Sequence, residues 1–224
     1  MLYEEWKEYY YLILKDFGFD RGEDELSARL LSESLRGEQA KPEDLEKIIK
    51  GRSATVVGDG PNLPNEIDDI CGVLISADEA TSVLLGNGIT PDIVVTDLDG
   101  RVEDLICANE KGAVVLIHAH GDNIDKIRML AGHFKGKVMG TTQSMPFRNI
   151  YNFGGFTDGD RGVFLAEHFG AVSIKLVGFD FNNPRAKGKR IELKKKKLDW
   201  AFLLISKLPP EKVILSRASS SSSG

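Results

Sequence analysis

Two aspartates separated by one residue form the clearest candidate for chemistry in this chain. Asp97 and Asp99 follow a short apolar run, residues 93–95, which has the Ile-Val-Val composition of a strand buried on both faces. In an extended backbone, side chains two positions apart point the same way. Two carboxylates held this close repel each other unless one binds a proton or a cation lies between them. The pair therefore predicts a divalent metal site.

The elements that must position this pair are predicted by the pattern of the chain from residue 51 onward. Short apolar runs alternate there with helical segments, which indicates βαβ units and a mostly parallel sheet. The sequence predicts an α/β fold with a three-layer, Rossmann-like sheet. The expected strands lie at 54–57, 73–76, 92–96, 114–117, 137–139, 172–177 and, at an edge, 213–215, and the expected helices near 79–86, 101–111, 122–132 and 159–169.

The first 50 residues have a different pattern, with apolar and aromatic side chains at helical spacing in three segments. We expect their aromatic stripe to pack on the main domain rather than to bind a partner. The predicted organisation is a helical N-terminal cap (1–50), an α/β catalytic domain (51–217) and a flexible serine-rich tail (218–224).

Charge and composition narrow the class of protein. A net charge of -5 over 224 residues argues against nucleic acid as a partner, because such proteins usually have a basic face. Cys71 and Cys107 belong to no ligand-spaced cluster, so we expect buried thiols and no disulfide framework or structural zinc. The acidic start and the lack of an apolar run of about 18 residues predict a cytoplasmic protein with no membrane segment.

The ends of the other expected strands also carry small, polar and acidic residues. The carboxyl ends of parallel strands share one edge of a sheet, and ligands bind in the crevice outside it, so we expect these residues to gather there. Carboxylates suit a hard cation such as Mg²⁺. The residues following the expected strands lie at 58–62, 77–79, 97–100, 118–123, 140–143 and 178–180.

Two of these stretches carry alternatives. His118, His120 and Asp122 resemble the metal-binding stretch of metallo-β-lactamase-type hydrolases, which predicts a zinc hydrolase as a competing function, although Asn123 replaces the next histidine of that motif. Residues 58–63 follow a strand as a dinucleotide fingerprint does, but Leu63 occupies the place of the third glycine. A nicotinamide site is therefore not expected, and the loop is equally compatible with a tight turn.

Two charged segments of the chain's second half have functional and structural interpretations. In the glycine-rich loop 153–162, Thr157 or Asp158 is expected to cap a helix whose free N–H groups, with Arg161, would contact a phosphate. The alternative is a loop that only caps the helix. The basic residues between 187 and 197 are expected to form a solvated face or a mobile loop, with phosphate or membrane binding as the alternative.

Taken together, residues 58–63, 76–78, 91–100, 118–123 and 156–161 resemble the archaeal 6-hydroxymethyl-7,8-dihydropterin pyrophosphokinase family. That family is similar to thiamin pyrophosphokinase, whose strand-ending Pro-Asp and Gly-Asp-x-Asp pattern matches residues 91–99. Thr96 and Gly100 depart from the thiamin enzyme's pattern, as do the histidines before Asp122, which favours a pterin as the substrate.

The resemblance implies Mg²⁺-dependent transfer of diphosphate from ATP, the co-substrate, to the hydroxymethyl group of the pterin, with release of AMP, in tetrahydromethanopterin or folate-type biosynthesis. Its small-molecule substrates would be ATP and the pterin. We expect Asp97 and Asp99 to bind the metal, with Asp78 and Asp122 completing the shell, and Asp122 or His120 to accept the hydroxyl proton. The alternatives are a thiamin pyrophosphokinase-like enzyme, the zinc hydrolase, and a nucleotide-binding glycosyltransferase-like domain.

The resemblance also leads to expectations for the substrate sites and for assembly. The aromatic face and polar groups that a pterin needs are expected from Phe179, Asp180 and Asn182. The analogy with thiamin pyrophosphokinase implies a homodimer. The residues expected to contact the nucleotide are Gly58, Asp59, Gly60, Pro61, Asn62, Thr141, Thr142, Gln143 and Arg161.

Overall fold

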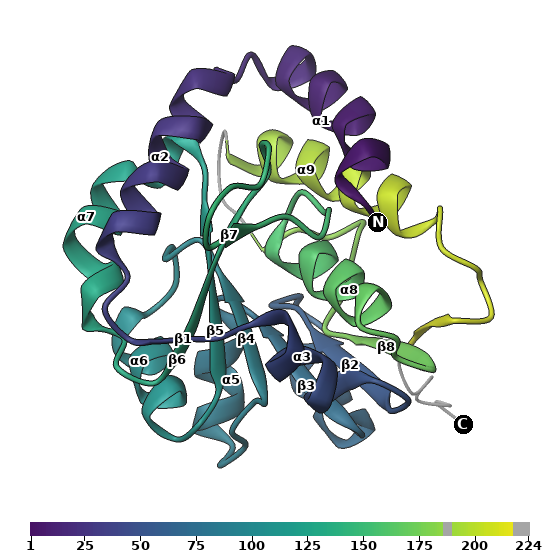
Figure 1. The fold of residues 1–224 in the computed structure, drawn as a ribbon. Helices are drawn as coiled ribbons and strands as arrows, with labels where there is room; N and C mark the ends of the chain where they lie inside the picture. Colours follow the sequence, from purple (N-terminus) through teal and green to yellow (C-terminus); the bar gives the residue numbers. More distant parts are fainter. Residues whose placement is uncertain (186–189, 217–224) are drawn as a thin grey trace, which may run out of the picture.

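A computed structural model describes residues 1–185 and 190–216, and nine strands of this part of the chain form one sheet (Figure 1). The strand order is β1-β6-β5-β4-β3-β2-β8-β9, with β7 paired to β6, and all these pairings are parallel. The strands are β1 (Glu38–Gln39), β2 (Ser53–Val57), β3 (Val73–Ala77), β4 (Ile93–Thr96), β5 (Val114–Ala119), β6 (Lys137–Thr142), β7 (Ile150–Tyr151), β8 (Ser173–Val177) and β9 (Val213–Leu215).

Helices cover both faces of the sheet. Helices α3 and α8 contribute to the apolar core on one face, and α2, α5, α6 and α7 contribute to the cores on the other. The α/β prediction is therefore confirmed. The helices are α1 (Tyr3–Phe17), α2 (Arg21–Ser34), α3 (Pro42–Ile49), α4 (Leu63–Glu66), α5 (Ala80–Gly86), α6 (Val102–Glu110), α7 (Ile124–Leu130), α8 (Asp158–His168) and α9 (Arg190–Ile205).

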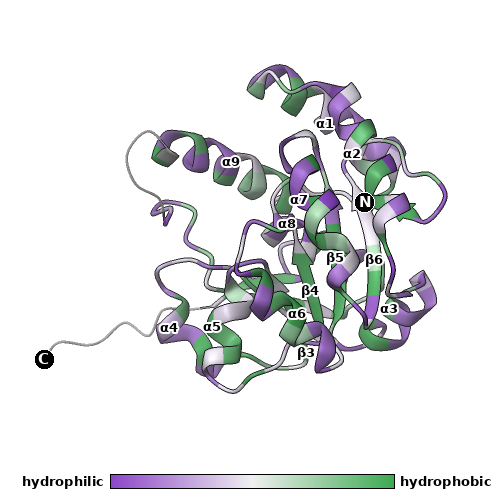
Figure 2. Cartoon of the chain, turned by 90° about the vertical axis from the view of Figure 1, so that its left-hand side faces the viewer, coloured by the Kyte–Doolittle hydropathy of each residue, from purple (hydrophilic) through white to green (hydrophobic). Residues whose placement is uncertain are grey.

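Strand β4 shows why the central strands are apolar throughout. Ile93 and Val95 pack in the core beneath α8, whereas Val94 packs in the opposite core with α6. Side chains alternate between the two faces of a sheet, so a strand covered on both faces needs apolar residues at every position. In Figure 2 β4 and β5 are largely hydrophobic, while the helices around them carry both kinds of residue.

The N-terminal helices pack closely on the rest of the molecule. Trp6 and Tyr10 of α1 are fully buried against Phe164 of α8 and Leu204 of α9, and α1 and α9 lie together above one end of the sheet (Figure 1). The predicted packing of the aromatic stripe is confirmed. The same region also supplies β1, an edge strand that the sequence did not predict. The predicted tail, 218–224, lies outside the described residues.

Three smaller expectations can be compared with the structure. The helix expected near 122–132 is a short α7 flanked by 3-10 turns at 121–123 and 131–133. Both cysteines are free, but Cys71 is exposed, so the prediction that it is buried was wrong. Among the described residues, every helix is too short or too polar to cross a membrane.

Candidate active site

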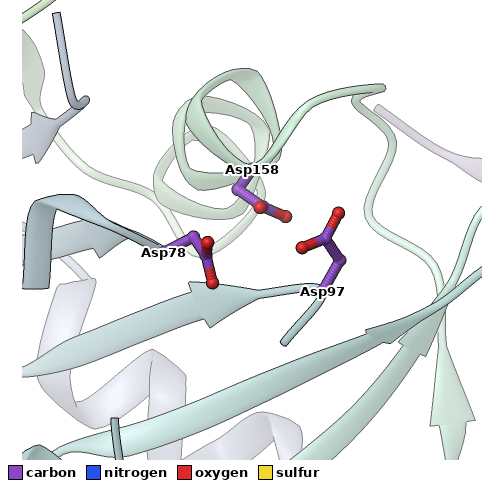
Figure 3. A group of neighbouring side chains, drawn as sticks. All are labelled: Asp78, Asp97 and Asp158. Carbon is purple, nitrogen blue, oxygen red and sulfur yellow. The ribbon is translucent and has the colours of Figure 1, made fainter. Parts of the chain in front are cut away.

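Three aspartates meet at the carboxyl edge of the central strands. One carboxylate oxygen from each of Asp78, Asp97 and Asp158 lies within 4.8 Å of the others. Figure 3 shows that the three side chains point toward a common space, Asp78 and Asp97 from the sheet and Asp158 from the helix above it. The sequence predicted two members of this group and missed Asp158 as the third.

The two sheet aspartates follow neighbouring parallel strands. Asp78 comes directly after β3 and Asp97 directly after β4, and the Asp78 N–H donates to the Val95 carbonyl at 2.8 Å. Asp78 has a φ of 39°, in the left-handed region that non-glycine residues rarely adopt. Such strain persists where the surrounding structure imposes it, and it often occurs at functional sites. Pairing of β3 with β4 thus brings the two carboxylates together.

The first turn of α8 presents the third carboxylate. Thr157 is the N-cap residue, and Asp160 accepts hydrogen bonds from the backbone N–H groups of Phe156 and Thr157 at 2.6 and 2.7 Å. Asp160 thus accepts hydrogen bonds from the backbone N–H groups before the helix, and Asp158 is not needed for this capping. Asp158, the first helical residue, is therefore free to point toward the sheet edge. Of the two caps predicted for this helix, the structure has Thr157.

The three carboxylates have different proton affinities. Burial and the charge of Asp97 raise the pKa of Asp78 to about 7, although Thr96 donates a hydrogen bond that opposes the shift. Burial and the same neighbouring charge raise the pKa of Asp158 well above its usual range, opposed by Arg161 at 3.2 Å. Burial alone would raise the pKa of Asp97. The hydrogen bond and the charge of His120 oppose this effect, and the net result is a pKa below the usual range.

His120 has a defined tautomer in this arrangement. Its Nδ1 accepts a hydrogen bond from the Asp122 backbone N–H at 3.2 Å, so Nε2 carries the hydrogen. Nε2 lies 3.3 Å from Asp97 Oδ2 and donates to it. His120 therefore orients Asp97 and stabilises its ionised form.

The donor set fits a divalent, hard cation. Three buried or half-buried carboxylates this close together repel one another, and this repulsion adds to burial in raising the pKa of Asp78 and Asp158. A cation between them removes the need to bind protons. Because all three ligands are oxygens, Mg²⁺ fits better than zinc, which is usually held by nitrogen or sulfur.

A pocket of about 90 Å³ opens beside the carboxylates. Its wall combines acidic, basic and aromatic side chains from α8, α9 and the loops at the sheet edge. The lining residues are Phe19, Asp97, His120, Asp122, Gln143, Phe156, Thr157, Asp158, Arg161 and Lys197. The pocket thus holds carboxylates that suit a cation and two basic side chains, Arg161 and Lys197, that suit an anion.

Two aspartates predicted as metal ligands lie apart from the carboxylate group. The Asp99 side chain is 63% exposed and pairs with Lys126 on α7. Asp122 is exposed and lines the pocket, but it is not a member of the group. The Asp-x-Asp spacing does not bring both side chains to one point, because the backbone turns after Thr96 and Leu98 has a left-handed φ of 68°. Among the described residues, the third carboxylate beside Asp78 and Asp97 is that of Asp158, and the metal roles of Asp99 and Asp122 stay predictions.

Comparison with known proteins identifies the family. Residues 29–185 match the family model described as 6-hydroxymethylpterin diphosphokinase MptE-like. The chain belongs to this family. A 6-hydroxymethyl-7,8-dihydropterin pyrophosphokinase from Pyrococcus furiosus is 49% identical over 187 residues, which cover 81% of this chain and 79% of that protein. Proteins of the same name from Methanothermobacter thermautotrophicus and Methanocaldococcus jannaschii are 42% and 39% identical over 89% and 92% of this chain, and 92% and 95% of their own lengths.

The resemblance inferred from the sequence is confirmed by these matches, as is the prediction of an enzyme of the pyrophosphokinase class. The stretch from 118 to 123, which also resembled a zinc hydrolase, makes contacts within the protein. His118 is buried, and its Nδ1 lies 3.1 Å from Thr141 Oγ1. Asn123 links two strand ends by donating to the carbonyls of Asp97 and His118. The first histidine and the asparagine thus have structural contacts.

The glycine-rich loop 58–62, predicted to bind the nucleotide, packs against the chain that follows β8. The N–H groups of Gly58 and Gly60 donate to the carbonyls of Val177 and Gly178 at 2.9 and 2.7 Å. A Cβ on Gly60 would lie 2.5 Å from the Gly178 oxygen, which explains the glycine. Two N–H groups of this loop are therefore already bonded.

The remaining polar groups of the 58–62 loop are also partly engaged. Asn62 donates to Glu66 Oε1 at 2.9 Å, and Asp59 pairs with Arg185 at 2.7 Å. Burial and a hydrogen bond with Glu79 raise the pKa of Asp59 to about 6, opposed by Arg185. Pro61 lies exposed in the turn before α4. The nucleotide role of this loop stays a prediction.

The second stretch predicted to bind the nucleotide, 141–143, is the buried end of β6 rather than a loop. Thr141 and Thr142 belong to the strand, and Gln143 is 3% exposed. The Gln143 side-chain amide donates to Asp24 Oδ2 at 2.8 Å, and its Oε1 accepts from Arg161 at 3.3 Å. Of all the residues expected to contact the nucleotide, only Gln143 and Arg161 line the 90 Å³ pocket.

Asp24 of α2 is the centre of a buried network that the sequence did not reveal. Its carboxylate accepts from Tyr10 Oη at 2.7 Å, from Gln143 at 2.8 Å and from the Gly121 N–H at 2.8 Å. These bonds join α1, α2, the end of β6 and the loop that carries His120. The N-terminal helices thus hold two walls of the pocket.

Replacing Asp24 with alanine is expected to lower the free energy of unfolding by about 3 kcal/mol, because three buried donors lose their acceptor. Urea unfolding of the metal-free protein measures this change. Glu25→Ala is the matched control, since the partner of Glu25 among the described residues is Arg21 at the surface, and it should cost less than about 0.5 kcal/mol. A loss for Asp24→Ala as small as that of the control would contradict the network.

The three residues expected to contact the pterin differ in burial and lie outside the pocket. Phe179 is half-buried, and a Cβ on Gly58 or Gly159 would lie 3.3 or 3.0 Å from its ring. The Asp180 carboxylate accepts from the N–H of Asn182 at 3.1 Å and caps a turn. Asn182 is exposed. None of the three lines the 90 Å³ pocket, and their pterin contact stays a prediction.

Proposed function

We propose that this chain transfers diphosphate from ATP to the hydroxymethyl group of 6-hydroxymethyl-7,8-dihydropterin in a Mg²⁺-dependent reaction that releases AMP. The names of its relatives support the pterin and the class of reaction. The observation that supports the phosphate chemistry is the group of Asp78, Asp97 and Asp158, which faces a pocket that also contains Arg161 and Lys197. Tetrahydromethanopterin or folate-type biosynthesis is the proposed pathway.

In this proposal Asp78, Asp97 and Asp158 hold Mg²⁺. The bound metal would neutralise charge on the triphosphate and align it for in-line attack. Around these ligands the chain supplies orientation. Thr96 donates to Asp78 and His120 donates to Asp97, and these contacts fix the carboxylates before a substrate binds.

The tautomer of His120 bears on the choice of proton acceptor. Its Nε2 carries a hydrogen that it donates to Asp97, and its Nδ1 is occupied by the Asp122 N–H, so neither nitrogen is ready to accept the hydroxyl proton. The Asp122 carboxylate is exposed and lines the pocket. We therefore assign Asp122 as the proton acceptor and His120 as a positioning residue.

The assay that tests this function measures AMP formed from ATP by the purified protein with Mg²⁺. Hydroxymethyl-dihydropterin, its fully oxidised form, thiamin and no acceptor are compared at equal concentration. We expect AMP in proportion to acceptor only with the pterins, and greatest with the dihydropterin. AMP formation with thiamin alone would support the thiamin reaction instead, and hydrolysis that depends on zinc without any acceptor would support the hydrolase.

Mg²⁺ is expected to raise the melting temperature, and to raise it more at pH 8 than at pH 5.5. Without metal, Asp78 in the folded protein binds a proton up to about pH 7, whereas in the unfolded chain it loses that proton near pH 4. Its contribution to stability is therefore full below pH 4 and falls as the pH rises to about 7. Metal must displace this proton at low pH.

The expected shift in melting temperature follows from the competition between the metal and the proton for Asp78. A group with a pKa of about 7 weakens apparent metal affinity roughly thirtyfold between pH 8 and pH 5.5. At pH 8 and a Mg²⁺ concentration about 100 times Kd, the stabilisation is about 2.7 kcal/mol, or roughly 5 °C or more. Differential scanning fluorimetry with and without Mg²⁺ measures the shift, with K⁺ at equal ionic strength as the control. An equal shift at both pH values would contradict the assigned ligands.

A further inference from the structure

One lysine of the basic run of α9, Lys197, lines the active-site pocket. Lys187 and Lys189 of the segment predicted to be a solvated face lie outside the described residues, and the structure places Lys194 to Lys197 on the first half of the helix. The four consecutive lysines have different surroundings. Lys195 is exposed, whereas Lys197 is half-buried and lines the pocket.

One aspartate of α1 fixes the rotation of α9. Asp16 accepts from Lys196 Nζ at 2.8 Å and from Trp200 Nε1 at 2.8 Å, and Lys196 Nζ also lies 4.5 Å from the centre of the Phe17 ring. Lys196 and Trp200 are four positions apart, so they share one face of the helix. With both held on α1, the next residue, Lys197, is turned toward the pocket.

The Lys197 side chain enters a wall made of aromatic residues. Its Nζ lies 6.0 Å from the centre of the Phe156 ring, and Phe156 and Phe19 line the same pocket. Phe17 packs between these two rings, with centroids 5.2 and 5.1 Å away. Among residues 1–185 and 190–216, Lys197 forms no ion pair. A cation is thus held at the pocket without a carboxylate partner.

The charges of the pocket show what this cation faces. Arg161, the other basic group there, already pairs with Asp158 at 3.2 Å and bonds Gln143 at 3.3 Å. A divalent metal on the three aspartates leaves one excess negative charge in that group. A triphosphate beside it would bring several more, and Lys197 is the basic side chain in the pocket that is free to neutralise them.

We propose that Lys197 is a phosphate-binding residue of the active site, presented to the triphosphate by α9 and positioned by Asp16. This inference rests on the proposed diphosphate transfer and adds a residue that binds the phosphates in the same pocket as the carboxylates. The ammonium donates to phosphate oxygens, which lowers the cost of bringing the anion next to the aspartates. Asp16 acts through Lys196 and Trp200 and is a positioning residue.

The test compares Lys197→Met with the wild type in the AMP assay. We expect kcat/KM for ATP to fall by about fiftyfold, with an unchanged melting temperature, because methionine keeps the apolar stem and loses the charge. Lys197→Arg should recover at least a fifth of the wild-type value. Lys195→Met, a change of the same charge at an exposed position of the same helix, should stay within twofold.

Asp16→Asn tests the positioning. We expect a five- to tenfold loss in kcat/KM, and the double variant with Lys197→Met should be no worse than Lys197→Met alone, because both act through one side chain. Multiplied losses in the double variant would overturn the role of Asp16.

The outcomes separate this inference from the proposed function. If the wild type forms no AMP with any acceptor, the proposed function fails. If the wild type is active and Lys197→Met retains more than half of its kcat/KM, or loses no more than Lys195→Met does, the phosphate-binding role of Lys197 is wrong while the function stands. An equilibrium readout gives the same decision, since Lys197→Met should weaken binding of a non-hydrolysable ATP analogue with Mg²⁺ by at least tenfold in calorimetry.

Discussion

Asp97→Asn is expected to lower kcat for AMP formation by on the order of a thousandfold and to leave the protein folded. Asp97 is the central member of the carboxylate group, since its charge raises the pKa of both Asp78 and Asp158. Asparagine keeps the size of the side chain, and the backbone carbonyl of residue 97 still accepts from Asn123. The variant loses the charge of the proposed metal ligand and keeps the backbone contact with Asn123, while its one side-chain oxygen can accept from either the Asp99 N–H or His120 Nε2.

The metal-free stability of this variant separates a chemical loss from a structural one. Removing one of three neighbouring charges relieves repulsion on Asp78 and Asp158, but it also removes the charge that His120 stabilises, so the melting temperature of Asp97→Asn without metal should stay close to that of the wild type. Its stabilisation by Mg²⁺ should disappear. A variant that loses activity, melts at a lower temperature and still responds to Mg²⁺ would show that Asp97 is a structural residue.

Asp158→Asn is expected to reduce kcat about a hundredfold or more, whereas Asp99→Asn should reduce it less than about fivefold. The spacing of the sequence predicted Asp99 as a metal ligand and Asp158 as a possible helix cap, whereas our proposal gives the metal to Asp158. Asp158 is half-buried in the carboxylate group, and Asp99 is 63% exposed beside Lys126. Steady-state assays at saturating Mg²⁺ measure the ratio of the two effects.

Two matched controls accompany this comparison. Asp125→Asn removes a charge from a side chain that is 87% exposed and lies outside the pocket, so it should behave as the wild type. Because Asp158 also pairs with Arg161, its variant is checked for folding by circular dichroism. If Asp99→Asn proves the more damaging change, the metal binds at the Asp-x-Asp turn and the group in Figure 3 is not the metal site.

Local sequence patterns predicted the sheet because each pattern expresses a local requirement. The run at 93–95 must be apolar at every position, since Val94 packs on one face and its neighbours on the other. The strand ends at Asp78 and Asp97 could be placed on one edge because parallel topology puts all carboxyl ends there. Residues 58–62 are rich in glycine because the chain after β8 approaches them closely.

The rest of the site depends on contacts that no local pattern encodes. Asp158 reaches the group because α8 packs on the sheet over β3 and β4. Its position in the chain, 158, is far from positions 78 and 97, so no local pattern connects it with them. Asp24 and Lys197 come from opposite ends of the sequence: Lys197 of α9 lines the pocket, and Asp24 of α2 bonds Gln143, which lines it. Asp99 lies outside the carboxylate group because a left-handed Leu98 turns the backbone between the two aspartates.

The most direct test of this account is a crystal structure of the protein grown with Mn²⁺ and a non-hydrolysable ATP analogue, in which anomalous scattering locates the metal. We predict Mn²⁺ at about 2.1 Å from carboxylate oxygens of Asp78, Asp97 and Asp158, with phosphate oxygens completing its shell. A metal bound instead by Asp99 and Asp122, or by His118 and His120, would contradict the site described by this structure.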